Sequence, residues 1–147
     1  MRTLGIDYGR RRHGLALSDE DGLIARPLEP LRRSRSEDED LARLISLASA
    51  HGVVRIVVGL PLLPDGTHGT MAQEAREFAE RVGAATGLAV EVFDERGSSA
   101  EAERALLEGN VSRRRRKSLR DGLSAVLILQ GYLALLRERS VEDQTEI

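Results

Sequence analysis

The first third of the chain alternates apolar and polar positions in a way that is typical of β-strands. Residues 2–8 and 13–18 predict two strands joined by a tight basic turn. Residues 23–31 predict a third strand, in which Pro27 and Pro30 favour an edge position because proline cannot donate to a sheet. Three strands with such short connections indicate an antiparallel meander.

After residue 35 the pattern changes to helices that alternate with apolar strands. The expected elements are, in order, a helix over 36–50, a strand over 53–60, a helix over 70–86, a strand over 88–93, a helix over 98–108 and a helix over 118–139. Capping boxes at 36–39 and 70–73 support two of these helix starts. The order predicts an α/β fold, with a five-stranded mixed sheet and helices on both faces.

The last predicted helix has an unusually apolar sequence. Residues 123–136 are apolar nearly all round, so this stretch is expected to be buried in the sheet or against a partner. The protein is therefore expected to be a monomer or a homodimer. Residues 1–139 are expected to form one domain, followed by a disordered acidic tail over 140–147.

The composition limits the classes of function. A chain of 147 residues with 41% hydrophobic and 31% charged residues suits one globular domain, and it has no apolar run long enough to span a bilayer. The absence of cysteine excludes disulfides, thiolate zinc sites and cysteine nucleophiles, and it fits a reducing cytoplasm. We therefore expect a cytoplasmic protein that does not bind membranes.

Charge is unevenly distributed, although the net charge is only −2. Basic residues cluster at 10–12, at 32–35 and at 113–117, and acidic residues cluster at 37–40. Aromatic residues make up only 3% of the chain, which disfavours a platform for base stacking. Any contact with nucleic acid is therefore expected to involve mainly the phosphate backbone.

Acidic residues at three places outside helix surfaces are expected to converge. Asp7 interrupts the first strand, Asp94 and Glu95 close the fifth strand, and Asp121 lies in the first turn of the last predicted helix. Alternation places Asp7 on a strand face with almost no bulk. Short right-handed crossovers are expected to set the first strand beside 53–60, with the fifth strand next.

Carboxylates without histidine or cysteine suit Mg²⁺ or Mn²⁺. Two such ions roughly 3.5–4 Å apart can activate a water and stabilise the leaving oxygen of a phosphodiester. Each acid also has a simpler explanation. Asp7 can end a strand, Asp121 can stabilise a helix start capped by Ser118, and the acids at 94–95 can form a solvated strand end. Sequence parity does not decide which residue of that last pair points inward.

Four motifs in register resemble the YqgF/RuvX family. They are Leu4-Gly5-Ile6-Asp7-Tyr8-Gly9 with residues 11–19, Val58-Gly59-Leu60-Pro61 with Asp65-Gly66-Thr67, Asp94-Glu95-Arg96 with residues 98–102, and residues 121–130. The resemblance covers nearly the whole chain. It implies an RNase H-like fold and a nuclease that uses Mg²⁺ or Mn²⁺ at Asp7, Glu95 and Asp121. His13, where the family usually has an aliphatic residue, and Gly97, where it usually has a leucine, depart from the pattern.

Residues that contact the substrate are expected around this centre. The candidates are Arg11 and Arg12 in the first turn, Gly59, Pro61, Asp65 and Gly66 around the loop after the fourth strand, Arg96, and the basic run of Arg113, Arg114, Arg115, Arg116 and Lys117. Family members are described as nucleases that mature the 5′ end of pre-16S rRNA and as Holliday junction resolvases.

The preferred interpretation is therefore a nuclease that acts on pre-rRNA. Branched DNA is the alternative substrate, and a non-catalytic module that binds rRNA is a second alternative. A phosphotransferase of the actin and sugar-kinase type is a third. It is disfavoured because such enzymes need two domains of this kind and the chain has room for one.

Overall fold

The five strands of the protein form a single mixed sheet. The computed structural model describes residues 1–61, 69–94 and 113–145. The strands are β1 (Arg2–Asp7), β2 (Arg12–Ser18), β3 (Ala25–Arg32), β4 (Val53–Leu60) and β5 (Ala89–Asp94), and they lie in the order β3-β2-β1-β4-β5. The first three strands are antiparallel neighbours, whereas β4 pairs parallel with β1 and with β5. The predicted meander and mixed sheet are confirmed.

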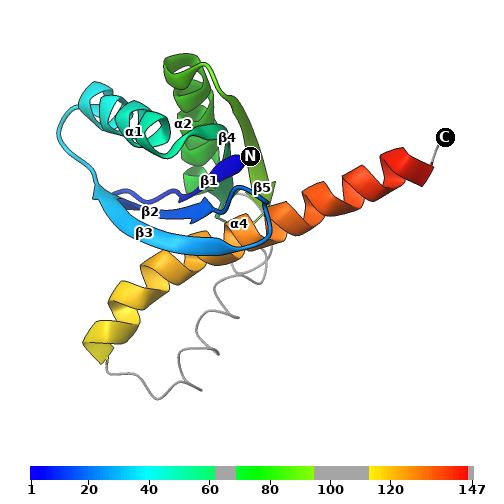
Figure 1. Cartoon of the computed structure of the whole chain (residues 1–147). Coiled ribbons are helices and arrows are strands. Elements are labelled where there is room, and N and C mark those ends of the chain that lie inside the picture. The colour runs from blue at the N-terminus through cyan, green and yellow to red at the C-terminus, as the bar shows by residue number, and fades with distance from the viewer. Residues whose placement is uncertain (62–68, 95–112, 146–147) are drawn as a thin grey trace.

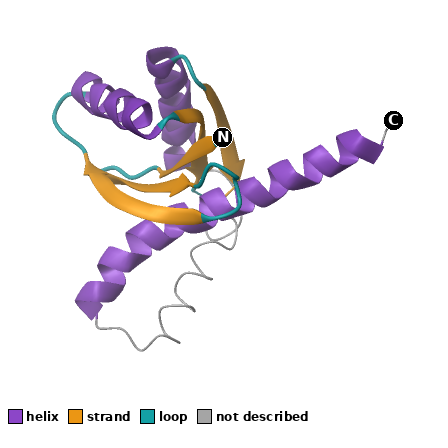
Figure 2. Cartoon of the chain, in the orientation of Figure 1, coloured by secondary structure: helices purple, strands orange, loops and turns teal. Residues whose placement is uncertain are grey.

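Helices cover both faces of this sheet, as predicted. On one face lie α1 (Glu37–His51) and α2 (Thr70–Thr86), and on the other face α4 (Arg113–Thr145) crosses the sheet (Figure 1, Figure 2). The helix expected over 98–108 lies outside the described residues. Both α1 and α2 end at glycines with left-handed backbone, Gly52 and Gly87, with φ of 65° and 72°.

Three predicted helix caps lie in the described part of the chain, and one is confirmed while two are wrong. The Ser36 side chain caps α1 by accepting a hydrogen bond from the Glu39 amide at 3.3 Å, as expected. Thr70 does not cap α2, because the helix already includes it and Gly69 is the N-cap residue. Ser118 does not cap α4, which begins five residues earlier at Arg113. Arginine and lysine are good helix formers, so nothing between those positions interrupts the helix.

The end of α4 also differs from the prediction. The helix continues past Arg139 to Thr145, so it includes most of the segment that the sequence analysis placed in an acidic tail. Within the described part of the chain, no helix is long and apolar enough to cross a membrane.

The core consists of one apolar layer on each side of the sheet. On the α1/α2 side, residues such as Leu4, Ile6, Ile56 and Val58 pack against the two helices, together with Leu44 and Phe78 from the helices themselves. On the other side, Ala16 and Val57 pack against α4 residues Ala125, Ile128, Leu129, Tyr132 and Leu133. Alternation along each strand therefore decides which helices a residue meets. One face of the apolar part of α4 is buried against its own sheet, and Leu123, Leu127 and Leu135 on its other positions are half-buried.

Gly5 permits a close approach between β1 and α4. A Cβ atom at this position would lie 2.8 Å from the Cβ of Leu129 and 3.3 Å from the carbonyl oxygen of Ala125. Near the start of β1, Thr3 lines a cavity together with Leu133 and Leu136. Contacts therefore move towards the start of α4 as β1 proceeds. Because Gly131 lies at Phe93 of β5 and Gly122 at Pro27 of β3, the helix crosses the strands diagonally (Figure 1).

Candidate active site and nucleic-acid interface

Asp7 occupies a part of the sheet that is almost free of side chains. It is the last residue of β1 and pairs directly with Gly14 of β2 and with Gly59 of β4. The preceding residue on the same face of β1 is Gly5. Since directly paired residues share a face, the Asp7 carboxylate has glycines on three sides. This arrangement leaves room for an ion or a phosphate group beside the carboxylate.

The path of α4 places Asp121 on the same face of the sheet as Asp7. Gly5 faces Leu129 and Ala125, and Asp7 lies two residues further along the strand. Asp121 lies one helical turn before Ala125, in the direction that α4 takes along β1. Gly122, the next residue, lies over β3, where an added Cβ would be 3.2 Å from Pro27, so the backbone of Asp121 is on the Asp7 face of the sheet near β3. The side chain of Asp121 is outside the described part.

The start of α4 at Arg113 removes a simpler explanation for Asp121. An acid in the first turn of a helix is favoured by the free amide groups and the helix dipole. Because Asp121 is in the third turn, neither effect accounts for an aspartate at this position. The predicted capping role of Asp121 is wrong, and the role in a site remains as a hypothesis.

The register of the sheet distinguishes between the two acids at the end of β5. Phe93 pairs with Gly59, which pairs with Asp7, so these three residues face α4. The Phe93 ring meets the Tyr132 ring of α4 edge-on, with 6.4 Å between centroids, which agrees with this orientation. Asp94, the next residue, consequently faces the α1/α2 side. Glu95, the other acid of the pair, lies outside the described residues.

The oxygen donors at this edge fit Mg²⁺ or Mn²⁺ in chemical type. Asp7 contributes a carboxylate in a cradle where glycines take the place of bulky neighbours. Among the side chains that the structure describes, no three His, Cys, Asp or Glu residues are close enough to form a metal site. The predicted set of Asp7, Glu95 and Asp121 includes two side chains beyond that part, so it stays a prediction.

The predicted substrate residues are only partly within the described structure. Gly59 is buried near the end of β4, Pro61 follows that strand, and Arg11 and Arg12 lie at the β1–β2 turn. Asp65, Gly66 and Arg96 lie outside the described residues. The run Arg113, Arg114, Arg115, Arg116 and Lys117 forms the start of α4, with its side chains undescribed.

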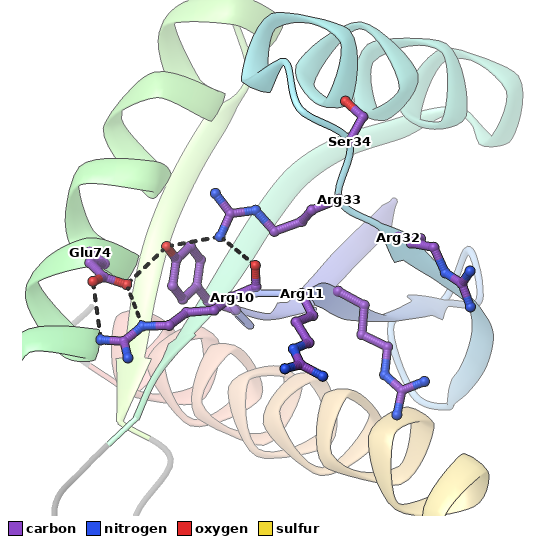
Figure 3. A pocket seen from close by; sticks show the side chains of 8 residues that line it. Arg10, Arg11, Arg32, Arg33, Ser34 and Glu74 are labelled. Atoms are coloured by element: carbon purple, nitrogen blue, oxygen red, sulfur yellow. Dashed lines mark hydrogen bonds and ion pairs between the residues drawn. The ribbon is translucent and has the colours of Figure 1, made fainter.

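A basic pocket lies beside the end of β1, and the sequence analysis assigned only part of it. Its cavity is about 870 Å³ and is lined by Tyr8, Arg10, Arg11, Arg12, Arg32, Arg33, Ser34 and Glu74 (Figure 3). Two basic clusters recognised in the sequence meet here because Arg12 pairs with Arg32 across β2 and β3. The two basic clusters can be recognised in the sequence, but only the pairing of β2 with β3 shows that they lie side by side. We call this set of residues the arginine pocket.

His13 lies in the core beneath the arginine pocket and is kept neutral. It is 1% exposed, stacks on Phe78 with 4.5 Å between ring centroids, and lies 5.2 Å from the ring of Tyr8. Its Nδ1 accepts a hydrogen bond from the Gly9 amide at 3.2 Å. Burial, together with the charge of Arg33, lowers the pKa of His13 to about 4, although nearby Asp40 opposes the shift. His13 therefore supports the β1–β2 turn as a neutral ring.

Acidification should destabilise the protein through His13. In the unfolded chain this group takes up a proton near pH 6.5, but in the fold only near pH 4, so the unfolded state binds more protons between these values. The free energy of unfolding should fall as pH decreases through this window, by roughly 2 kcal/mol at about pH 4.5. Urea unfolding of the wild type and of His13→Leu, at pH 7 and at pH 4.5, measures the difference.

The leucine variant serves as the control because it cannot titrate at this position. Its own loss of stability on acidification should be smaller than that of the wild type by about that amount. Equal losses in the two proteins would contradict a neutral buried imidazole.

Comparisons with known proteins agree with this architecture. The family described as "RuvX: Holliday junction resolvase" matches residues 1–135. A protein of Symbiobacterium thermophilum named "Putative pre-16S rRNA nuclease" is 52% identical over 143 residues, which cover 97% of this chain and 99% of that protein. A protein of the same name from Myxococcus xanthus is 45% identical over 133 residues, covering 90% of this chain and 87% of that protein.

Two solved structures are similar in fold. The structure titled "T. thermophilus RuvC in complex with Holliday junction substrate" has a TM-score of 0.55 and 19% identity, covering 92% of this chain and 96% of that chain. The fowlpox virus resolvase with its substrate Holliday junction DNA has a TM-score of 0.58 and 8% identity, covering 92% and 99%. At this identity the likeness concerns the fold alone, and it confirms the RNase H-like architecture.

Proposed function

Because the chain belongs to the RuvX family, described as Holliday junction resolvases and including proteins named as pre-16S rRNA nucleases, we propose that it hydrolyses phosphodiester bonds at the Asp7 end of the sheet. The substrate we propose is the 5′ region of pre-16S rRNA, the activity for which its relatives are named. The observation that supports this most directly is the Asp7 carboxylate, which has glycines on three sides and α4 at its open face.

Asp7, Glu95 and Asp121 would hold one or two divalent ions at this edge. Such ions supply an activated water and stabilise the charge on the leaving oxygen of the phosphodiester. Residues next to Asp7 would provide the space that the ions and the phosphate need. Gly14 and Gly59 carry no side chains on either side of Asp7, which leaves space at these two positions for a phosphate.

The start of α4 supports a nucleic-acid substrate. Its first turn consists of arginines and contains no acidic residue. Basic side chains at a helix N-terminus lie against the positive end of the helix dipole, which is unfavourable for the helix. A role in helix stability therefore does not explain this cluster, whereas attraction of a phosphate backbone does. The cluster lies on the same helix as Asp121, about two turns before it.

Cleavage by the purified protein should depend on a divalent ion and on the type of nucleic acid. We expect cleavage of a pre-16S rRNA leader in Mg²⁺ or Mn²⁺, and none in EDTA, because the carboxylates alone cannot activate water effectively. Labelled pre-16S leader, single-stranded DNA and a four-way DNA junction, each incubated with each ion, provide the measurement.

The outcomes of this panel separate the functions. Faster cleavage of the leader than of both DNA substrates supports the proposal. Faster cleavage of the four-way junction would identify a junction resolvase instead. Binding of the leader without cleavage of any substrate in either ion would identify a non-catalytic rRNA-binding module.

A further inference from the structure

The arginine pocket extends around the edge of the sheet at the β1–β2 turn, beside the residue that follows Asp7. Asp7 faces α4, whereas Tyr8, the next residue, packs on the α1/α2 side and lines the pocket. Glu74 of α2 closes one side of the pocket, and residues 32–34 at the end of β3 close another (Figure 3). This part of the pocket therefore lies on the opposite face of the sheet from Asp7, whereas the paired residues Arg12 and Arg32, in phase with Gly14, lie on the Asp7 face.

One part of the pocket is held in place by a hydrogen-bonded network. Arg10 makes two bonds to the carboxylate of Glu74, at 3.2 and 3.3 Å, and the Tyr8 hydroxyl donates to the same carboxylate at 3.2 Å (Figure 3). Arg33 lies above the Tyr8 ring, 5.5 Å from its centroid, and donates to the Tyr8 hydroxyl at 3.3 Å. Arg33 also donates to the carbonyl oxygens of Gly9 and Arg10.

This network neutralises little of the positive charge. Five arginines line the pocket with a single carboxylate, that of Glu74, which Arg10 already engages. The bonds of Arg33 are to a hydroxyl and to carbonyl groups, which orient its guanidinium without cancelling its charge. Arg11 and Arg32 are exposed, and in the described part of the chain no carboxylate forms an ion pair with either one.

Arg11 and Arg32 repel the other arginines of the pocket, and a bound anion relieves this repulsion. The guanidinium group matches the geometry of phosphate and can form two parallel hydrogen bonds to it. A cavity of about 870 Å³ is larger than one phosphate group needs, and its Arg10 and Arg11 lie at the β1–β2 turn, on the edge of the sheet where β1 ends. A strand of nucleic acid that crosses this edge would present successive phosphates to both sides.

We propose that the arginine pocket binds backbone phosphates of the nucleic-acid strand, outside the bond that is cleaved at Asp7. This inference rests on the proposed function for the identity of the strand. Arg11, Arg32 and Arg33 hold the phosphates, and Glu74 weakens the site by engaging Arg10. Because the contacts are to phosphate, the pocket fixes the position of the strand and does not read its sequence.

Binding of RNA without cleavage tests the pocket separately from catalysis. A labelled oligonucleotide from the pre-16S leader is titrated with the full chain in EDTA, at several salt concentrations, and anisotropy is recorded. The double variant Arg11→Gln/Arg32→Gln should raise Kd roughly tenfold or more. It should also reduce the slope of log K against log salt by about 0.7 for each lost contact. The side chains replaced have no ion pair to lose in the described part of the structure.

A matched control removes the same charge elsewhere. Arg26→Gln/Arg137→Gln replaces two exposed arginines that do not line the pocket, and Kd should change less than twofold. Equal weakening by the two double variants would overturn the proposal, because the pocket arginines would then attract RNA no more strongly than other arginines on the surface.

Replacement of Glu74 should change affinity in the opposite direction. Glu74→Gln removes the one carboxylate of the pocket and releases Arg10, so RNA should bind several-fold more tightly and with a steeper salt dependence. Glu80→Gln, on an exposed position of the same helix, is the control and should change Kd little. Unchanged or weaker binding by Glu74→Gln would contradict the proposal.

Inorganic pyrophosphate distinguishes a strand from a free anion. If the arginine pair affects binding of pyrophosphate but leaves RNA binding unchanged, the pocket takes a free anion and the proposal is wrong. Loss of RNA binding in a protein that cleaves nothing would support the pocket while rejecting the nuclease, so failure of the two proposals can be told apart.

Discussion

Asp7→Asn should eliminate metal-dependent cleavage of the pre-16S leader while leaving the fold intact. The amide has nearly the same shape as the carboxylate but carries no charge, and the glycines around this position tolerate the exchange. Loss of a direct ligand should reduce the rate by far more than the roughly 10–100-fold that is typical when a residue supporting a ligand is lost. Single-turnover cleavage at saturating Mn²⁺ measures the effect, and thermal unfolding checks the fold.

The matched control is Asp38→Asn, the same chemical change at an exposed position of α1 on the opposite face of the sheet. This variant should cleave at the wild-type rate. RNA binding in EDTA should also survive in Asp7→Asn, because the arginines that attract phosphate are unchanged and one negative charge has been removed. Cleavage by Asp7→Asn at a rate near that of the control would refute the assignment of Asp7 as a metal ligand.

Gly5→Ala should destabilise the protein and impair cleavage together. The added methyl group would lie 2.8 Å from the Cβ of Leu129, an atom that cannot move unless the backbone of α4 moves. Overpacking of this kind costs about 1–3 kcal/mol of folding free energy. The corresponding fall in Tm is roughly 3–10 °C for a chain of this length. Calorimetry or urea unfolding provides the measurement.

Activity should fall more than the loss of stability explains, because Gly5 permits the close approach of β1 and α4, the two elements that carry Asp7 and Asp121 of the proposed site. A displacement of about 1 Å at a reacting centre can cost a factor of 10² in rate. Gly83→Ala in α2 is the matched control, since its Cβ would meet Val90 at an ordinary 3.5 Å. That variant should be as stable as the wild type or more stable, because alanine favours the helix over glycine. Wild-type stability and activity in Gly5→Ala would contradict this account of the β1–α4 contact.

The two phosphate-binding regions proposed here differ in their relation to the sheet. The start of α4 lies on the same side as Asp7, whereas the arginine pocket extends from the α1/α2 side around the β1–β2 turn to Arg12 and Arg32. Gly9 makes this turn possible, since a Cβ there would lie 2.1 Å from the carbonyl oxygen of Arg12. A single short turn therefore connects the carboxylate site to the arginine pocket.

Local sequence patterns were sufficient for most of the secondary structure. The strands and the helices α1 and α2 begin and end close to the predicted residues, because alternation, apolar spacing and glycine stops act over a few neighbouring residues. The predicted start of α4 near Ser118 was wrong because it relied on the same local features. Ser118 has the local features of a cap, but the arginines before it are helix formers, and a local pattern does not exclude a longer helix.

What the sequence determined by itself was the inventory of chemical groups and the face on which each strand residue lies. It placed Asp7 on a bare strand face and, through four motifs, predicted a nuclease of known fold. Only the tertiary structure decided which distant residues meet. It excluded Asp94 from the face of Asp7, it removed the capping role of Asp121, and it brought the arginines of two clusters into one pocket. The physical reason is that strand register and helix packing depend on contacts between residues far apart in the chain, and no local pattern contains them.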